Sequence, residues 1–76
     1  MDCIRLGVVG QMHNVLYFTF NQNTPMLNLK KSYSEACGLP VTRLRFLFMS
    51  KRIYDNDTPR SLGMEHNNVV EVYRVE

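Results

Sequence analysis

The side chains with the widest chemical repertoire in this 76-residue sequence are two cysteines and two histidines. Cys3, Cys37, His13 and His66 carry the thiol and imidazole groups that commonly bind zinc. Their spacing gives neither a C-x-x-C nor an H-x-x-x-H pattern, so the sequence predicts no metal site and no cofactor. Because short disulfide-stabilised chains normally carry four or more cysteines, both thiols are predicted to be reduced, as in the cytosol or nucleus.

The sequence also contains no recognisable catalytic motif. Ser50, Asp55 and the histidines could form a triad on paper, but no nucleophile-elbow motif surrounds the serine. The four glycines are scattered, so no phosphate-binding loop is predicted. A core of this size supplies only about 3–5 kcal/mol of net stability, which argues against an elaborate catalytic cleft. The protein is therefore predicted not to be an enzyme.

Charge and composition argue against several kinds of binding partner. A hydrophobic content of 45% and a charged content of 21% are typical of a globular protein, predicted here as one domain, 1–76. The net charge of +2 is too small to indicate nucleic acid or a membrane surface. No apolar run is long enough to cross a bilayer. Arg43, Arg45, Lys51 and Arg52 form a modest basic cluster, interpreted as a solvated strand face or, alternatively, as a contact for phosphate or an acidic partner.

The elements that would position these groups begin with two alternating segments, 3–9 and 15–22, which predict a β-hairpin. A helix is predicted after it, because apolar residues then recur every three to four positions. Thr24 is the expected cap and Pro25 the expected first helical residue. Gly38 suits the left-handed position that ends the helix.

The second half of the chain predicts three more strands and a single helical turn. In "LRFLF", at 44–48, the residues at even positions point inward and those at odd positions outward. A tight turn then leads to a short strand near 52–53, a helical turn over 58–63 and a last strand at 68–75. The resulting order, β-β-α-β-β-(short helix)-β, predicts an α+β roll with one helix packed on a mixed sheet.

These segments resemble the small ubiquitin-like modifier, SUMO, within the ubiquitin-like β-grasp family. The resemblance is carried by "IRLGVVGQ", "LKKSY", "LRFLF", "RI-x-DN-x-TP", "LGME" and "V-x-EVY", and it runs without a gap from about residue 3 to 75. It implies a protein modifier in the nucleus or cytoplasm that enters the SUMO conjugation pathway through a C-terminal Gly-Gly. Because the sequence given ends at Glu76 without Gly-Gly, it is expected not to be conjugatable in this form.

The resemblance also implies a groove between the second strand and the helix that binds SUMO-interacting motifs as an added strand. The matching residues are Tyr17, Phe18, Thr19, Phe20, Asn21, Leu29, Lys30 and Tyr33. The family's flanking cations are mostly replaced here, by Thr19, Asn21, Asn28 and Ala36. Motif binding is therefore expected to be weaker and less dependent on acidic flanks.

A second face, which in the family binds the conjugating enzyme, is also altered. Its matching residues are Leu47, Met49, Glu65 and Asn68. Met49 replaces a usual acidic residue and His66-Asn67-Asn68 replace an acidic run, which puts the pathway enzymes in doubt as partners. Val15, Tyr17, Leu47 and Met49 point outward, and an interface and a merely apolar surface remain open as explanations.

Two other interpretations remain open as well. Binding charges are lost on two faces while the core is kept, which leaves open a redesigned or de novo sequence on a SUMO backbone with no biological partner. A SUMO-like domain of a larger adaptor is the other. In every case the chain is predicted to be a monomer that binds proteins rather than nucleic acid or membranes.

Overall fold

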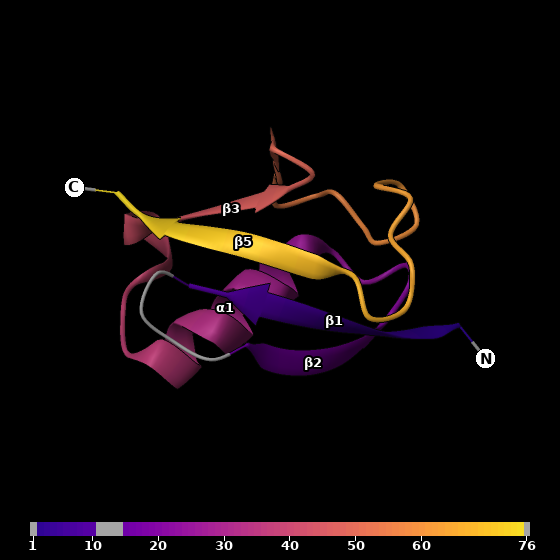
Figure 1. Cartoon of the computed structure of the whole chain (residues 1–76), viewed down its shortest axis with the longest axis horizontal. Helices are drawn as coiled ribbons and strands as arrows, with labels where there is room; N and C mark the ends of the chain where they lie inside the picture. The colour runs from indigo at the N-terminus through magenta and orange to yellow at the C-terminus, as the bar shows by residue number, and fades with distance from the viewer. Residues whose placement is uncertain (1, 11–14, 76) are drawn as a thin grey trace.

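The computed structural model describes residues 2–10 and 15–75, and it shows a five-stranded sheet with one helix across one face (Figure 1). The elements are β1 (Cys3–Val9), β2 (Leu16–Asn21), α1 (Met26–Cys37), the 3-10 helix η1 (Val41–Arg43), β3 (Leu44–Phe48), β4 (Lys51–Arg52) and β5 (Val69–Arg74). The strand order across the sheet is β2-β1-β5-β3-β4. The parallel β1–β5 pair lies at the centre, and the other pairs are antiparallel. The predicted α+β class and mixed sheet are confirmed.

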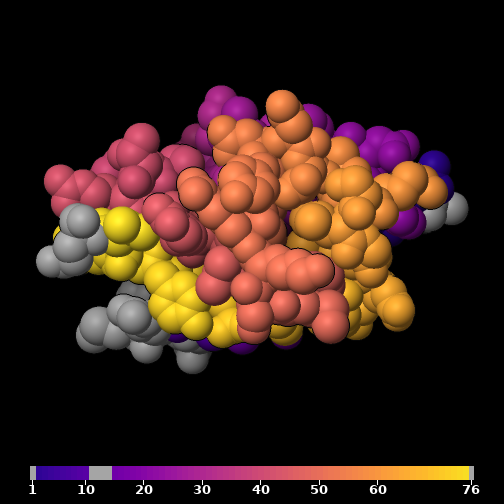
Figure 2. All heavy atoms as spheres, turned by 90° about the horizontal axis from the view of Figure 1, so that it is seen from above, coloured from indigo at the N-terminus to yellow at the C-terminus, as the bar shows by residue number. Residues whose placement is uncertain are grey.

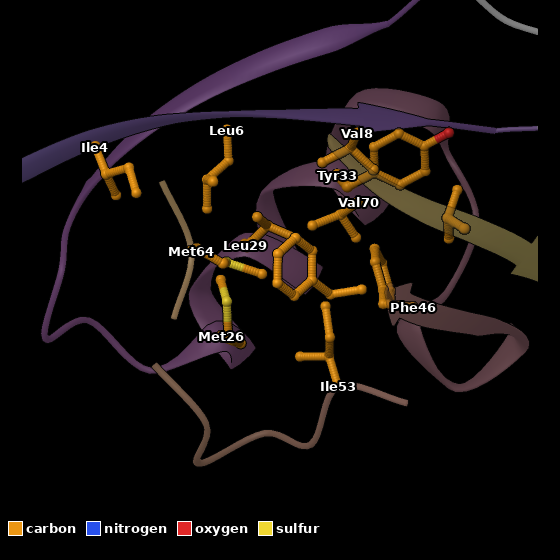
Figure 3. Packing of buried hydrophobic residues seen from close by; sticks show 12 residues of the cluster. Ile4, Leu6, Val8, Met26, Leu29, Tyr33, Phe46, Ile53, Met64 and Val70 are labelled. Carbon is orange, nitrogen blue, oxygen red and sulfur yellow. The ribbon is translucent and has the colours of Figure 1, made fainter. Parts of the chain in front are cut away.

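The core lies between the inner face of the sheet and the apolar stripe of α1. Figure 3 shows β1 and β5 contributing side chains from above, the helix from the middle, and the chain after β4 from below. The buried hydrophobic residues are Ile4, Leu6, Val8, Met26, Leu29, Tyr33, Phe46, Phe48, Ile53, Met64, Val70 and Val72. The predicted alternation therefore holds on β1, on β3 and on the buried valines of β5.

The start of α1 differs from the prediction. The backbone N–H of Met26 donates to the carbonyl of Asp57 at 2.7 Å, and that of Leu27 donates to the carbonyl of Asp55 at 3.1 Å. Pro25 is the capping residue, and Thr24 gives no side-chain cap. The expectation of a threonine cap is wrong because a loop distant in sequence satisfies the N–H groups that a side chain usually satisfies.

The end of α1 agrees with the prediction. Gly38 has φ of +76° and its N–H donates to the carbonyl of Ser34, which is the left-handed termination expected after the last turn. The Ser34 hydroxyl also donates to the carbonyl of Leu39, which fixes the chain as it leaves the helix.

The segment 58–63 forms hydrogen-bonded turns rather than the predicted short helix. Thr58 does act as a cap, because its hydroxyl accepts the backbone N–H of Ser61 at 3.0 Å. Gly63 has φ of +69° and ends the turn as expected. The three consecutive backbone bonds, from Leu62 to Thr58, from Gly63 to Arg60 and from Met64 to Pro59, span different numbers of residues and so do not form a regular helix.

Gly7 allows β2 to cover the outer face of β1. A Cβ atom at Gly7 would lie 2.8 Å from Cγ1 of Val15 and 3.0 Å from Cε1 of Tyr17. Both side chains therefore lie directly over the glycine backbone, where any larger residue would push them outward. Because of this close approach, Val15 is partly buried and one side of the Tyr17 ring packs on β1, although Tyr17 remains 47% exposed.

Candidate functional site

The β2 edge of the sheet carries the first group of predicted site residues. Phe18 and Phe20 point to the helix side of the sheet, opposite Leu6 and Ile4 of β1. Their ring centroids are 6.3 Å apart and both rings are only partly buried against the core. Because β2 is an edge strand, apolar surface and unpaired backbone groups lie next to each other here.

The helix residues beneath these rings are core residues. Leu29 is fully buried, and Tyr33 is 3% exposed with its ring packed edge-on against Phe46 at 5.9 Å. Burial and the neighbouring Cys37 thiol raise the pKa of Tyr33 above 10.0. Both residues are therefore part of the core against which Phe18 and Phe20 pack, and Phe18 and Phe20 are the more accessible members of this predicted group.

Lys30 does not join this group. Its Nζ donates to Oδ1 of Asp55 at 2.8 Å, and it lies 6.0 Å from the ring centroid of Phe46 on β3. β3 is three strands away from β2 in the sheet, about 14 Å at ordinary strand spacing. The Lys30 ammonium therefore joins the helix to the loop after β4, away from the other residues predicted to line the groove.

This ion pair is the one place where a charged side chain is buried among the described residues. The Lys30 side chain is 9% exposed, whereas Asp55 is 59% exposed. The hydrogen bond and charge of Lys30 lower the pKa of Asp55 below 3.8, with smaller contributions from Arg52 and Lys31. No sequence pattern indicates this pair, because Lys30 lies among polar residues in the helix pattern.

The outward side of β2 presents Tyr17, Thr19 and Asn21. All three are exposed, and they follow one another on the face away from the helix. The guanidinium of Arg5 on β1 lies 3.9 Å from the ring centroid of Tyr17. The Arg5 guanidinium is therefore a cation on this outer face, whereas the polar side chains of β2 itself, Thr19 and Asn21, are neutral.

The second predicted face is spread over three segments. Leu47 lies on the outer face of β3, opposite Glu71 on β5, and is partly buried. Met49 is 78% exposed at the tip of the β3–β4 hairpin. Glu65 and Asn68 close the turn before β5, where the Glu65 N–H donates to Oδ1 of Asn68 at 2.8 Å.

The described cysteine and histidine side chains do not form a cluster. Cys3 and Cys37 are free thiols, as predicted. Within residues 2–10 and 15–75, no three histidine, cysteine or acidic side chains come together in a way that could hold a metal ion. His13 lies outside the described residues, while Nδ1 of His66 accepts the backbone N–H of Arg5 at 3.1 Å. The described part of the chain also has no helix of the length and apolarity that crossing a bilayer requires.

Comparison with known proteins now assigns the fold to a family. A family model described as "Ubiquitin-2 like Rad60 SUMO-like" matches residues 4–73. The chain belongs to this SUMO-like family. It is 48% identical over 73 residues to the small ubiquitin-related modifier of Caenorhabditis elegans, which covers 96% of this chain and 80% of that protein.

Solved structures agree on the architecture of this SUMO-like chain. The ubiquitin of Caldiarchaeum subterraneum superimposes with a TM-score of 0.90 over 97% of this chain and 95% of that one, at 14% sequence identity. At that identity the comparison shows the ubiquitin fold alone. The predicted resemblance to SUMO is thus confirmed, and the chain is a homologue of a protein modifier, not of an enzyme.

Proposed function

We propose that this SUMO-like protein binds SUMO-interacting motif peptides at the β2 edge as an added strand, in the nucleus or cytoplasm. The observation that carries the proposal is the pairing of a six-residue edge strand with two half-exposed phenylalanines on its helix side. An added strand would satisfy the free backbone groups of β2, while alternate side chains would pack on Phe18 and Phe20.

The charges around this edge shape its specificity. Thr19 and Asn21 flank the groove on β2 and Asn28 flanks it on α1, and all three are exposed and neutral. Lys30 is engaged with Asp55 and leaves the groove margin without that cation as well. Acidic flanks on a peptide would find little to attract them here, so apolar packing and backbone pairing would supply most of the affinity.

The test is an NMR titration with two peptides that share one apolar core. One peptide has aspartate flanks and the other has asparagine flanks. We expect amide shifts along 17–21, similar affinities for both peptides, and little change between low and high salt. Absence of shifts on β2, or a strong and salt-sensitive preference for the aspartate peptide, would contradict the proposal.

A variant with added positive charge on β2 tests directly whether charge at this edge controls peptide binding. T19K/N21K should improve binding of the aspartate peptide several-fold, since each exposed ion pair contributes about 0.2–1 kcal/mol. Binding of the asparagine peptide should stay unchanged. Thr42→Lys, an exposed substitution in η1, is the matched control and should change neither affinity.

A further inference from the structure

The opposite edge of the sheet carries a second surface with different chemistry, which we call the β3–β4 face. It consists of Arg45, Leu47, Met49 and Arg52. Figure 2 looks onto this edge, where the residues from β3 to β4 (pink to orange) cover the centre of the view beside β5 (yellow). We propose that the β3–β4 face docks an acidic polypeptide segment that places an aliphatic side chain between its carboxylates.

The strand register places one aliphatic residue between two guanidinium groups. Arg52 lies directly opposite Leu47 in the antiparallel β3–β4 pair, so their side chains share the outer face about 5 Å apart at Cβ. Arg45 precedes Leu47 by two residues on the same face, about 6.8 Å along the strand. An aliphatic side chain seated on Leu47 would therefore have a cation on each of two sides.

Both arginines remain free of protein carboxylates. The ion pairs among the described residues join Lys30 to Asp55 and Arg60 to Asp2, and they include neither Arg45 nor Arg52. No acidic residue occurs anywhere in 36–54. The positive potential of the face is thus available to a partner.

The two nearest carboxylates are already engaged. Glu71 lies opposite Leu47 on β5, and its Oε2 accepts the hydroxyl of Tyr73 at 3.2 Å. Asp55 follows β4 and holds the buried ammonium of Lys30 at 2.8 Å. Each has a structural partner of its own and neutralises the face only in part.

Met49, at the tip of the β3–β4 hairpin, adds a second apolar contact, although its backbone conformation is unfavourable for methionine. Met49 and Ser50 have φ of +51° and +67°, the pattern of a type I′ turn that favours asparagine and glycine. A methionine in this conformation that is 78% exposed serves no purpose in the core. Its flexible, polarizable side chain suits contact with another apolar group instead.

The features of the face favour a polypeptide over nucleic acid. The sequence pI of about 8.7 is below the value above about 9 that is typical of nucleic-acid-binding domains. Base stacking uses aromatic rings, whereas the apolar groups of the β3–β4 face are the aliphatic side chains of Leu47 and Met49, which suit the apolar side chains of a polypeptide.

The same charges argue against a second copy of the chain as the occupant. An isologous contact would bring Arg45 and Arg52 of each copy against those of the other. The edge itself is also short, because β4 has only two residues. The partner would therefore dock through side chains, with little of the strand addition proposed at β2.

The test is fluorescence anisotropy with a labelled eight-residue peptide of alternating aspartate and leucine. Arg45→Glu and Arg52→Glu should each weaken binding at least tenfold, and Arg45→Gln should give a smaller loss. Lys31→Glu, at an exposed lysine on α1, makes the same change in net charge and should stay within twofold of wild type. Amide spectra of each variant confirm that the fold is kept.

Two further measurements distinguish binding at the β3–β4 face from binding at the β2 groove and from binding of nucleic acid. Ala36→Glu places a negative charge on the exposed side of α1 near the β2 groove, and it should leave binding unchanged if the β3–β4 face is the site. An eight-nucleotide oligothymidylate should compete poorly. The proposal is overturned if wild type does not bind the peptide, if Lys31→Glu weakens binding as much as Arg45→Glu, if Ala36→Glu abolishes binding, or if the oligonucleotide binds more tightly than the peptide.

Discussion

The two edges of this sheet differ in length, charge and apolar character. β2 is six residues long, its own polar side chains are neutral, and the aromatic rings of Phe18 and Phe20 are partly buried on its helix side. β4 is two residues long, and its surroundings present arginines together with aliphatic Leu47 and Met49. A long neutral edge can bind through backbone pairing, whereas a short cationic edge must bind through side chains.

On the two proposals above, the two edges of one sheet would bind partners by different chemistry. Both edges rest on the same core, since Leu29 lies beneath the β2 groove and Phe46 beneath the β3–β4 face. The salt dependence of binding should therefore distinguish the two surfaces, while unfolding should remove both together.

The largest effect should come from removing that shared core. Phe46 is 1% exposed and packs edge-on against Tyr33, so Phe46→Ala should lower the free energy of unfolding by about 3–5 kcal/mol. Phe48, at 9% exposed, should cost somewhat less. Urea denaturation measures both, and Met49→Ala at the exposed tip is the control, with a change within about 0.5 kcal/mol. Native-like stability in Phe46→Ala would show that the inward face of β3 is misassigned.

The next effect concerns the ion pair that joins α1 to the loop behind β4. The pKa of Asp55 is lowered from 3.8 in the folded state, chiefly by Lys30. This interaction therefore contributes stability above pH 3.8, and the contribution is lost as the pH falls through the lower folded-state value. In Lys30→Met, the free energy of unfolding should therefore decrease less than in wild type as the pH falls below 3.8.

At pH 7 the same substitution should change the free energy of unfolding by about 1 kcal/mol or less, because Asp55 is mostly exposed and returns to water. Urea denaturation from pH 2 to pH 7 measures both expectations. Lys31→Met removes only a minor contribution to the lowered pKa of Asp55, so it should change the stability at acid pH much less than Lys30→Met does. If Lys30→Met and wild type lost the same free energy of unfolding on acidification, the role assigned to the Lys30–Asp55 ion pair would be contradicted.

The hairpin tip offers a smaller and opposite effect. M49N/S50G gives the type I′ turn its preferred residues and should raise the free energy of unfolding by about 1 kcal/mol. At roughly 4–8 °C per kcal/mol for a domain of this size, thermal unfolding would detect it. The same variant should weaken the acidic peptide at the β3–β4 face and leave the β2 groove unchanged. A loss of stability would mean that the turn carries no strain.

Much of the fold was predictable because local patterns and tertiary contacts agree. Ile4, Leu6 and Val8 alternate and are buried, and Gly38 ends the helix in the left-handed conformation that it alone adopts readily. The tight turn at 49–51 was also expected and is confirmed.

Two of the misses share one physical cause, which is contact between segments distant in sequence. The N–H groups at the start of α1 bond to carbonyls of Asp55 and Asp57, which no local capping pattern reveals. Lys30 is buried because Asp55, 25 residues later, accepts its ammonium. The η1 helix was missed for a different reason, since three residues carry too little periodicity to be recognised.

The most direct test of the central claim is one NMR titration with a single apolar peptide flanked by aspartates, performed at low and high salt. Two sets of amide shifts should appear, one along 17–21 and the other along 45–52. The account predicts that high salt abolishes the second set and leaves the first nearly unchanged. Equal salt dependence of both sets, or a single set of shifts, would contradict the claim that the two edges bind by different chemistry.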